Sequence, residues 1–272
     1  MNNSITLNNA THRALPIVAG LIAAVCMLLA LSAPANAFDD GSRTQRFAFK
    51  SFDVSAFQRT DPNDPMAGNV IPSPASGSHD DLKLTADFDY YFRGEANWGT
   101  FSNDDTARDL RLTMPAYVLG NPNAAPQCSN DDFQNDRCSS GSKIGHTVAT
   151  VRMRIAVLTG GWWTGADPLG GDVINLEPEG NDIATFGIHI SVLGVNIRVK
   201  SHVRVDNSDS HRIVTTIENL PNSPAPGVWI VIEKMDLVLF GMLGDRPFLT
   251  MPTSCDEWSK MDAHAVAYNG RE

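Results

Sequence analysis

The feature that most constrains the fold is a regular alternation of apolar and polar side chains. Between residues 82 and 92 every second position is apolar, and the positions between them include Lys83, Thr85, Asp87 and Asp89. Successive side chains of a strand point to opposite faces, so this spacing predicts a long, half-buried strand. The pattern recurs in four further stretches: 110–114, 149–157, 197–205 and 261–268. Apolar runs at 213–217 and 228–243 complete the set.

Clusters of Pro, Gly, Asn and Asp separate these stretches. They lie at 61–65, 103–105, 121–123, 160–161, 170–171, 206–209 and 221–227. Short strands divided by turn residues are typical of two packed antiparallel sheets. The sequence therefore predicts an all-β fold, an antiparallel β-sandwich, with one short helix in the loop between Cys128 and Cys138. That helix would cover 130–136, with Ser129 as its N-cap and Asp132 three residues later.

The N-terminal segment has the features of an export signal. Residues 17–33 are almost purely apolar, Arg13 precedes them, and the small residues Ala35 and Ala37 suit a signal peptidase. We expect residues 1–37 to be a signal peptide, cleaved before Phe38. The alternative is a retained anchor, because about 17 apolar residues approach the length of a membrane span.

The remaining chain divides into two parts by composition. Residues 38–77 are rich in Pro, Ser and Asp and poor in long apolar runs. We expect a partly ordered N-terminal arm there, with one strand near 47–57. Residues 78–272 carry the strand patterns and form the predicted β-sandwich domain.

The charge of the chain excludes one class of partner. Arg13 is the only charged side chain of residues 1–37, so the mature chain keeps 20 basic and 31 acidic groups. Such an acidic surface repels phosphate backbones, which argues against nucleic-acid binding. No later segment is apolar and long enough for a helical membrane span. We therefore expect a secreted or cell-surface protein with no transmembrane segment after signal cleavage.

The cysteines suggest one disulfide. Export favours disulfide formation, and Cys26 leaves with the signal peptide. Cys128 and Cys138 close a short loop and are the preferred pair, with a Cys138–Cys255 bridge as the competing arrangement. In the first case Cys255 is left over, either buried and inert or available to a partner. No cysteines or histidines have the spacing of a zinc site.

Four segments, taken in order, resemble one known family. They are 114–128 (MPAYVLGNPNAAPQC), 138–145 (CSSGSKIG), 174–187 (INLEP running on to ATFG) and 246–255 (RPFLTMPTSC). The match is to a domain of large bacterial secreted and cell-surface proteins. The resemblance implies an exported, largely β module. It brings no catalytic residues with it, and its motifs suit turns and strand ends.

Chemical sites are few. Six of the seven histidines follow residue 37, and none is paired at a metal-binding spacing. Ser78, His79 and Asp80 are the residue types of a catalytic triad, but a triad is a spatial arrangement and adjacency is no evidence for one. Acidic loops, chiefly the one between Cys128 and Cys138, are candidates for calcium, although Asp and Asn also form ordinary turns.

Two surfaces are candidates for ligand contact. Trp162 and Trp163 stand between glycines in a predicted exposed loop, where paired aromatic rings can stack on a sugar or anchor a protein. One of them can equally fold back over the end of the sandwich. A second surface is the basic face formed by Arg198, Lys200, His202 and Arg204, although such faces are usually solvated.

These observations give a functional expectation. The chain is expected to be an exported, extracytoplasmic protein with a binding or structural role, whose partner is a surface glycan or another protein. No catalytic, cofactor or metal residues are assigned. The alternative is an extracellular hydrolase or carbohydrate-active protein on the same scaffold. A third hypothesis is that the protein is a subunit of a larger assembly, joined through Cys255 or an open edge strand.

Overall fold

The computed structural model describes residues 47–61, 63–72, 74–89, 92–93, 100–101, 106–114, 118–155, 166–192, 195–206, 212–251, 261–268 and 270. The chain divides into Met1–Asn36 and Ala37–Glu272, and every described residue belongs to the second unit. The predicted signal peptide therefore lies outside the described residues. Within those residues, no helix combines the length and the apolar character needed to cross a bilayer.

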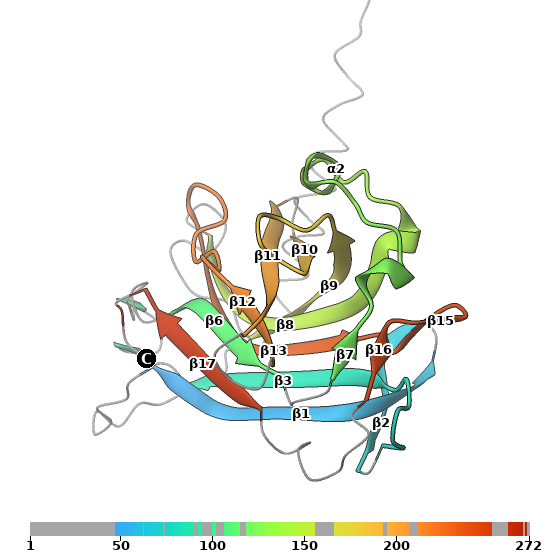
Figure 1. The fold of residues 1–272 in the computed structure, drawn as a ribbon. Coiled ribbons are helices and arrows are strands. Elements are labelled where there is room, and N and C mark those ends of the chain that lie inside the picture. The colour runs from blue at the N-terminus through green and yellow to red at the C-terminus, as the bar shows by residue number, and fades with distance from the viewer. Residues whose placement is uncertain are drawn as a thin grey trace, which may run out of the picture. The chain divides into compact units, whose positions relative to one another are not determined.

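The predicted all-β, antiparallel architecture is confirmed. Eleven strands form one sheet in the order β17-β6-β12-β11-β10-β9-β8-β13-β3-β1-β2 (Figure 1). Their bounds are β1 Ala48–Asp61, β2 Asp64–Ile71, β3 Asp81–Asp89, β6 Ala107–Thr113, β8 Lys143–Ile155, β9 Asp167–Leu176, β10 Ala184–Val192, β11 Val195–Val205, β12 Ile213–Ile217, β13 Val228–Leu239 and β17 Asp262–Ala267. Short pairs accompany the sheet: β4 Phe92–Arg93 with β5 Thr100–Phe101, β7 Leu119–Gly120 with β16 Leu249–Thr250, and β14 Met242–Leu243 with β15 Arg246–Pro247.

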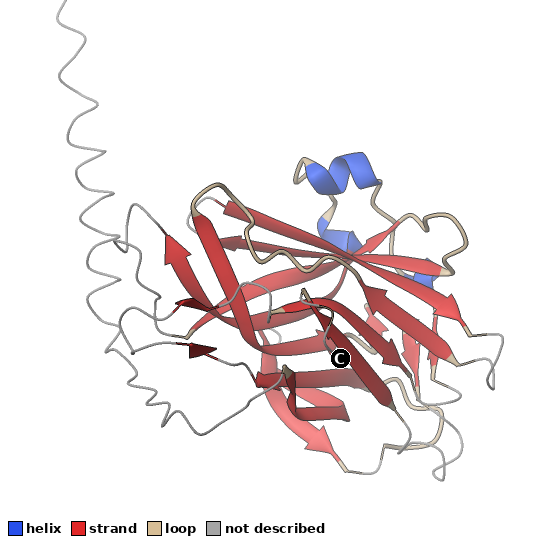
Figure 2. Cartoon of the chain, turned by 90° about the vertical axis from the view of Figure 1, so that its left-hand side faces the viewer, coloured by secondary structure: helices blue, strands red, loops and turns tan. Residues whose placement is uncertain are grey.

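The two facing layers of the predicted sandwich are halves of this single sheet. Hydrogen bonding is continuous from β17 to β2, and the curl brings β17 into contact with β1 (Figures 1 and 2). Inward side chains of β3, β8 and β13 share a core with those of β6, β10 and β11. One strongly curled sheet therefore buries its own concave face.

Register shifts accompany the curl. The β8–β13 ladder shifts between Ile232 and Lys234, and the β1–β3 ladder shifts between Phe49 and Ser51. An extra residue on one strand bends that strand and increases its twist. Such irregularities let the sheet close over its core without a break in the hydrogen-bonded order.

The segment expected to be an N-terminal arm contributes two strands to the sheet. β1 covers the stretch in which one strand was expected and pairs with β3, for example Ala56 opposite Leu82. β2 pairs with β1 and forms one edge of the sheet. Ala56 and Phe57 of β1 are buried, so this part of the chain belongs to the packed structure.

The predicted disulfide and short helix are both present. Cys128 and Cys138 are bonded, with their Cα atoms 5.5 Å apart. Helix α2, Asn130–Gln134, begins after Ser129, whose hydroxyl accepts the Asp132 N–H at 3.1 Å. Phe133 of this helix is buried against Gly187 of β10, where an added Cβ would lie 2.5 Å from the Phe133 ring. Gly187 therefore allows the disulfide loop to lie against the sheet.

One predicted turn is wrong. Gly170 and Gly171 were assigned to a break between strands, but both lie inside β9. A Cβ on Gly171 would approach the His189 carbonyl oxygen and Ile190 Cγ1 of β10 to 2.5 Å. The absence of a side chain at this position serves close strand packing rather than a turn.

Candidate functional site

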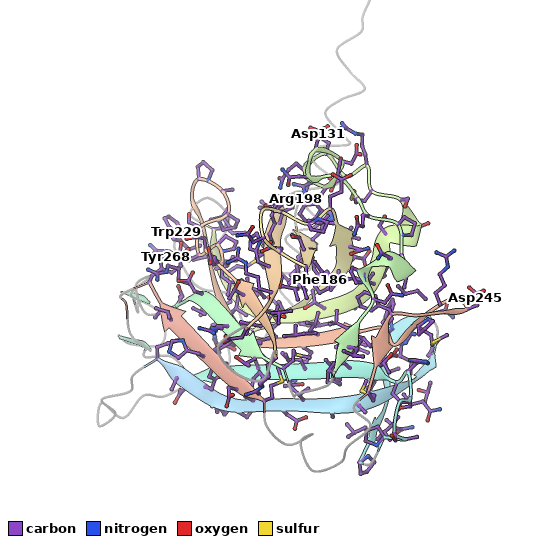
Figure 3. All side chains as sticks on the ribbon, viewed as in Figure 1. Asp131, Phe186, Arg198, Trp229, Asp245 and Tyr268 are labelled. Carbon is purple, nitrogen blue, oxygen red and sulfur yellow. A yellow bond between two sulfur atoms is a disulfide. The ribbon has the colours of Figure 1, made fainter. Side chains whose placement is uncertain are left out.

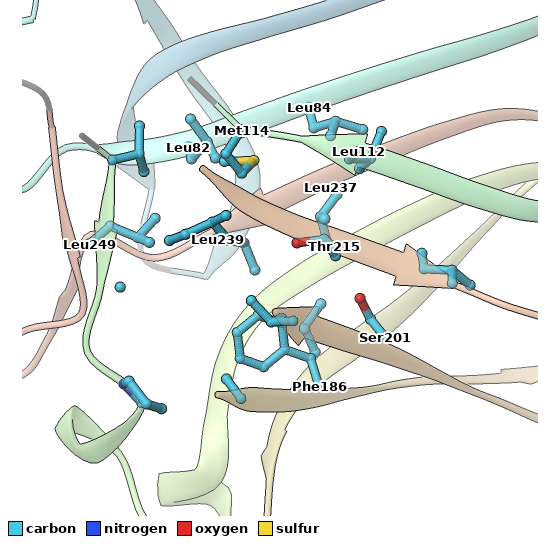
Figure 4. Close-up of a pocket in the computed structure, with 18 of the residues that line it drawn as sticks. Leu82, Leu84, Leu112, Met114, Phe186, Ser201, Thr215, Leu237, Leu239 and Leu249 are labelled. Carbon is cyan, nitrogen blue, oxygen red and sulfur yellow. The ribbon is translucent and has the colours of Figure 1, made fainter. Parts of the chain in front are cut away.

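The concave face of the sheet encloses an apolar cavity of about 240 Å³ (Figure 4). Its walls are inward side chains of β3, β6, β10, β11, β12 and β13, with Val173 from β9. The closing segment at one end adds Phe248 and Leu249. The cavity therefore lies between the two halves of the curled sheet, where side chains from distant parts of the sequence meet.

The alternating sequence pattern explains why these walls are apolar. On β3 the inward positions are Leu82 and Leu84, and on β10 they include Phe186 and Ile188. Each inward position follows the previous one by two residues, as strand geometry requires. In Figure 3, Phe186 points into the interior, whereas Arg198 of β11 lies on the outer side near α2. The same strands thus carry an apolar inner face and a charged outer face.

Two hydroxyl groups are the only polar side chains among the described residues that line the cavity. They belong to Ser201 of β11 and Thr215 of β12 (Figure 4). Ser201 pairs with Ile217 and Thr215 with Val203, so the two residues occupy diagonal positions on adjacent strands. Ser201 is 4% exposed. Neither hydroxyl has a hydrogen-bond partner among the described residues.

A closing segment covers one end of the cavity. It consists of β7, Phe248 and β16, and in it Leu249 pairs with Gly120 and Thr250 with Leu119. The Asn121 N–H donates to the Phe248 carbonyl oxygen at 2.8 Å and extends this pairing. Gly120 and Phe248 both line the cavity, so the closing segment forms part of its wall.

Asn175 fixes the loop that follows β7. Its side chain is fully buried, and Nδ2 donates to the carbonyl oxygens of Pro122, at 2.8 Å, and Ala125, at 3.1 Å. Pro122 lines the cavity. The amide oxygen of Asn175 has no partner among the described residues. Asn175 therefore joins the end of β9 to the loop that closes the cavity.

Apolar side chains are exposed beside the cavity. Ile183, which lines it, is 45% exposed, and Leu119, next to the lining residue Gly120, is 62% exposed. Most large apolar side chains of the described residues are buried, and only Val70 joins these two as strongly exposed. Ile183 and Gly120 are therefore exposed members of the cavity lining.

Three of the four segments that carried the family resemblance contribute residues to the cavity wall. Val118 and Gly120 come from the first segment, Phe186 from the third, and Phe248 and Leu249 from the fourth, and all five line the cavity. Phe186 and Phe248 are in edge contact, with ring centroids 6.1 Å apart. The sequence predicts turns and strand ends for these segments. In the structure they also lie around one cavity.

The residues predicted for ligand contact lie elsewhere or are not described. Trp162 and Trp163 fall outside the described residues, as does Cys255. Cys128 and Cys138 form their disulfide beside Ile174 and Leu176, apart from the residues that line the cavity. The predicted ligand contact at Trp162 and Trp163 therefore stays a prediction. The disulfide lies in a small apolar cluster away from the cavity.

The acidic loop considered for calcium is occupied by arginine side chains. Arg137 binds Asp131 and Asp132, and Arg198 donates to Asp136 at 2.6 Å. Hydrogen bonds from Arg137 and Arg198 lower the pKa of Asp132 and Asp136, respectively. Among the described residues no three side chains of His, Cys, Asp or Glu are grouped to hold a metal ion.

Ser78, His79 and Asp80 do not form a relay. The Ser78 hydroxyl donates directly to Asp80 at 2.6 Å, while His79 Nδ1 lies 2.8 Å from the Leu249 carbonyl oxygen. A catalytic serine needs its hydroxyl on the histidine ring. Of these three side chains, His79 is the one with a hydrogen bond to the closing segment.

The basic face of β11 is also paired. Lys200 binds Glu179, and both His202 and Arg204 bind Asp182, at 2.6 and 2.7 Å. Burial alone would raise the pKa of Asp182, but hydrogen bonds from His202 and Arg204 outweigh it and leave the pKa lowered. The charges of this face therefore satisfy one another.

Sequence reasoning missed the cavity, although one signal was present. In the stretch 197–205 the inward positions are Ile, Val, Ser, Val and Val, so Ser201 breaks an otherwise apolar series. Thr215 interrupts Ile213 and Ile217 in the same way. A small polar residue at an inward position indicates either a buried hydrogen bond or a polar contact in a cavity.

Comparison with known proteins adds no assignment: no family model, no curated protein and no solved structure matches this chain.

Proposed function

We propose that this protein is an exported binding protein that takes an apolar small molecule into the cavity of its curled sheet. The cavity itself supports this proposal best: about 240 Å³, lined by apolar residues apart from Ser201 and Thr215. An apolar cavity of about 150 Å³ engineered into another protein stays dry and binds benzene. A larger cavity of the same character is suited to a hydrocarbon group.

The energetic cost of an empty cavity argues against a simple packing defect. At roughly 24 cal/mol per Å³, a sealed and empty void of this size would cost up to about 6 kcal/mol. The whole free energy of unfolding of a domain is only about 5–15 kcal/mol. A ligand that fills the space recovers this energy through burial of apolar surface, at about 25 cal/mol per Å². Binding therefore gives the cavity a physical reason to exist.

The chemistry of the lining favours binding over hydrolysis. Among the described residues, the cavity walls hold no carboxylate, histidine or basic side chain. A hydrolase on this scaffold would need an acid or base beside its nucleophile. The hydroxyls of Ser201 and Thr215 have no such neighbour in the lining. The role we propose is to shield an apolar molecule from water.

Export is supported by the sequence rather than by the fold. The apolar run at 17–33 and the small residues Ala35 and Ala37 suit signal cleavage, and the Cys128–Cys138 disulfide suits an oxidising compartment. Secretion into that compartment would place the cavity where apolar molecules need a carrier. An intact mass that begins at Phe38 is the expected result for the exported protein, and a retained N-terminus would contradict export.

Binding can be tested with N-phenyl-1-naphthylamine, a neutral fluorophore that brightens in apolar surroundings. We expect the purified protein to raise its emission in a saturable way. In Ala184→Phe a bulky ring enters the cavity from β10, and saturable binding should fall at least tenfold. Ser191→Phe is the matched control, because Ser191 is an exposed residue of the same strand.

The result depends on both variants being folded, which circular dichroism and the melting temperature report. Equal binding by Ala184→Phe and the unchanged protein would overturn the proposal. If Ala184→Phe does not fold, organic extraction of the purified protein followed by mass spectrometry provides the second measurement. An extract that holds no apolar molecule, together with a protein that binds no fluorophore, also overturns it.

A further inference from the structure

The two hydroxyls in the cavity wall indicate the class of ligand. Ser201 is 4% exposed and Thr215 lies diagonal to it on the neighbouring strand. Neither has a partner among the described residues. A hydroxyl that faces a cavity without a protein partner can form a hydrogen bond there only with water or with a ligand. Each hydroxyl can both donate and accept, so each is free to bind a ligand oxygen.

The rest of the lining sets the charge of the ligand. No Lys, Arg, His, Asp or Glu is among the described residues that line the cavity. An ionised group moved from water into such surroundings pays a large desolvation penalty that nothing there would offset. The enclosed part of the ligand is therefore neutral.

The lining also sets the shape of the ligand. Leu, Ile, Val and Met dominate the walls, and among the described residues that line the cavity the only aromatic rings are those of Phe186 and Phe248. These two rings already contact each other at the closed end. Flexible aliphatic walls suit an aliphatic chain. The two hydroxyls lie on one wall of the cavity, which β11 and β12 form.

We propose that the cavity selects a neutral aliphatic lipid that carries one hydrogen-bonding oxygen group, an alcohol, a ketone or an ester. Ser201 and Thr215 bind that oxygen, and the aliphatic walls bind the chain. The inference rests on the proposed function, since it names the ligand class of the same cavity. It predicts discrimination against a plain hydrocarbon and against a carboxylate of the same length.

Three probes of equal chain length separate these classes: 1-octanol, octane and octanoate. Each is titrated against the bound fluorophore in the unchanged protein, in Ser201→Ala, in Thr215→Val and in the double variant. We expect 1-octanol to displace the fluorophore most strongly. Each substitution should weaken 1-octanol about fivefold, the value of one hydrogen bond, and leave octane unchanged.

Thr216→Val is the matched control. Thr216 follows Thr215 on β12 but lies on the other side of the strand, where its hydroxyl is 3.5 Å from the His202 carbonyl oxygen. We expect this variant to bind 1-octanol as the unchanged protein does. Because Ser201→Ala and Thr215→Val remove hydroxyls without partners, neither should lower the melting temperature, which keeps the comparison within folded proteins.

The outcomes distinguish the two proposals. If the double variant binds 1-octanol as tightly as the unchanged protein, the ligand class is wrong and the binding function stands. If octanoate is the strongest ligand, the neutral class is wrong. If neither the fluorophore nor any probe binds, the proposed function fails and the ligand class fails with it.

Discussion

Strands β10 and β11 present a charged face outward and an apolar face to the cavity, and their polar groups are paired differently on the two sides. Outside, Arg198, Lys200 and Arg204 each bind a carboxylate. Inside, the Ser201 hydroxyl has no partner among the described residues and borders open space. A polar group that already has a hydrogen-bond partner gains little from a ligand, whereas an unpaired group gains a hydrogen bond when a ligand binds. This difference supports our proposal that the inner face, rather than the outer face, binds the ligand.

The largest effect on stability is expected at the outer face. Asp182 is buried and accepts hydrogen bonds from His202, Arg204 and Thr185. Asp182→Ala should lower the free energy of unfolding by about 3 kcal/mol, because a buried charge network loses its centre. Urea denaturation measures this loss. Asp262→Ala, which removes an exposed partner of Arg212, should cost less than about 1 kcal/mol; equal losses would show that burial of the network is unimportant.

Loss of the disulfide should separate stability from binding. Replacement of Cys128 and Cys138 by Ser should lower the free energy of unfolding by roughly 2–3 kcal/mol, as expected for so short a loop. Neither cysteine lines the cavity, so fluorophore affinity should not change. Denaturation and titration of the same sample test both statements. Weaker binding by the folded variant would mean that the disulfide loop supports the cavity after all.

A fully buried threonine, Thr185, and a half-buried one, Thr215, test the pairing contrast directly. The Thr185 hydroxyl donates to Asp182 at 3.1 Å and accepts the Glu179 N–H at 3.2 Å, whereas Thr215 has no partner among the described residues. Thr185→Val should lower the free energy of unfolding by about 1–2 kcal/mol, and Thr215→Val should leave it unchanged or raise it slightly. Calorimetry decides between them. A comparable loss in both would indicate that Thr215 is already satisfied.

The smallest expected effect depends on pH. Hydrogen bonds from His146 and Lys143, against a smaller opposing effect of burial, lower the pKa of Asp172 to about 2. A carboxyl whose pKa is lower in the folded than in the unfolded state stabilises the fold above about pH 4 and loses that contribution as the pH falls toward 2. The stability difference between the protein and Asp172→Asn should shrink over this window. It should not exceed about 1 kcal/mol, because Asp172 is 45% exposed.

The sequence predicted local structure well and the assembled site poorly. Alternation at residues 82–92 located β3, and Ser129 located the start of α2, because both depend on neighbouring residues. The prediction of a turn at Gly170 and Gly171 was wrong, because the role of Gly171 depends on the carbonyl oxygen of His189 across the sheet. The cavity joins Leu84, Ser201 and Phe248, and no local pattern reports how residues so far apart in the chain leave space between them.

The order of the strands also has a consequence for when this chain can fold. β3 pairs with β13, and the Thr85 hydroxyl donates to Asp236 across a sequence separation of 151 residues. β6 likewise pairs with β17, which lies far along the chain. Sheets dominated by distant pairings close slowly, because the loop entropy is lost before the contacts form. Half of the chain cannot complete its sheet until the other half is available. We propose that this polypeptide is exported. If its sheet cannot close before the last strand is available, the chain stays unfolded while it passes through a translocation pore.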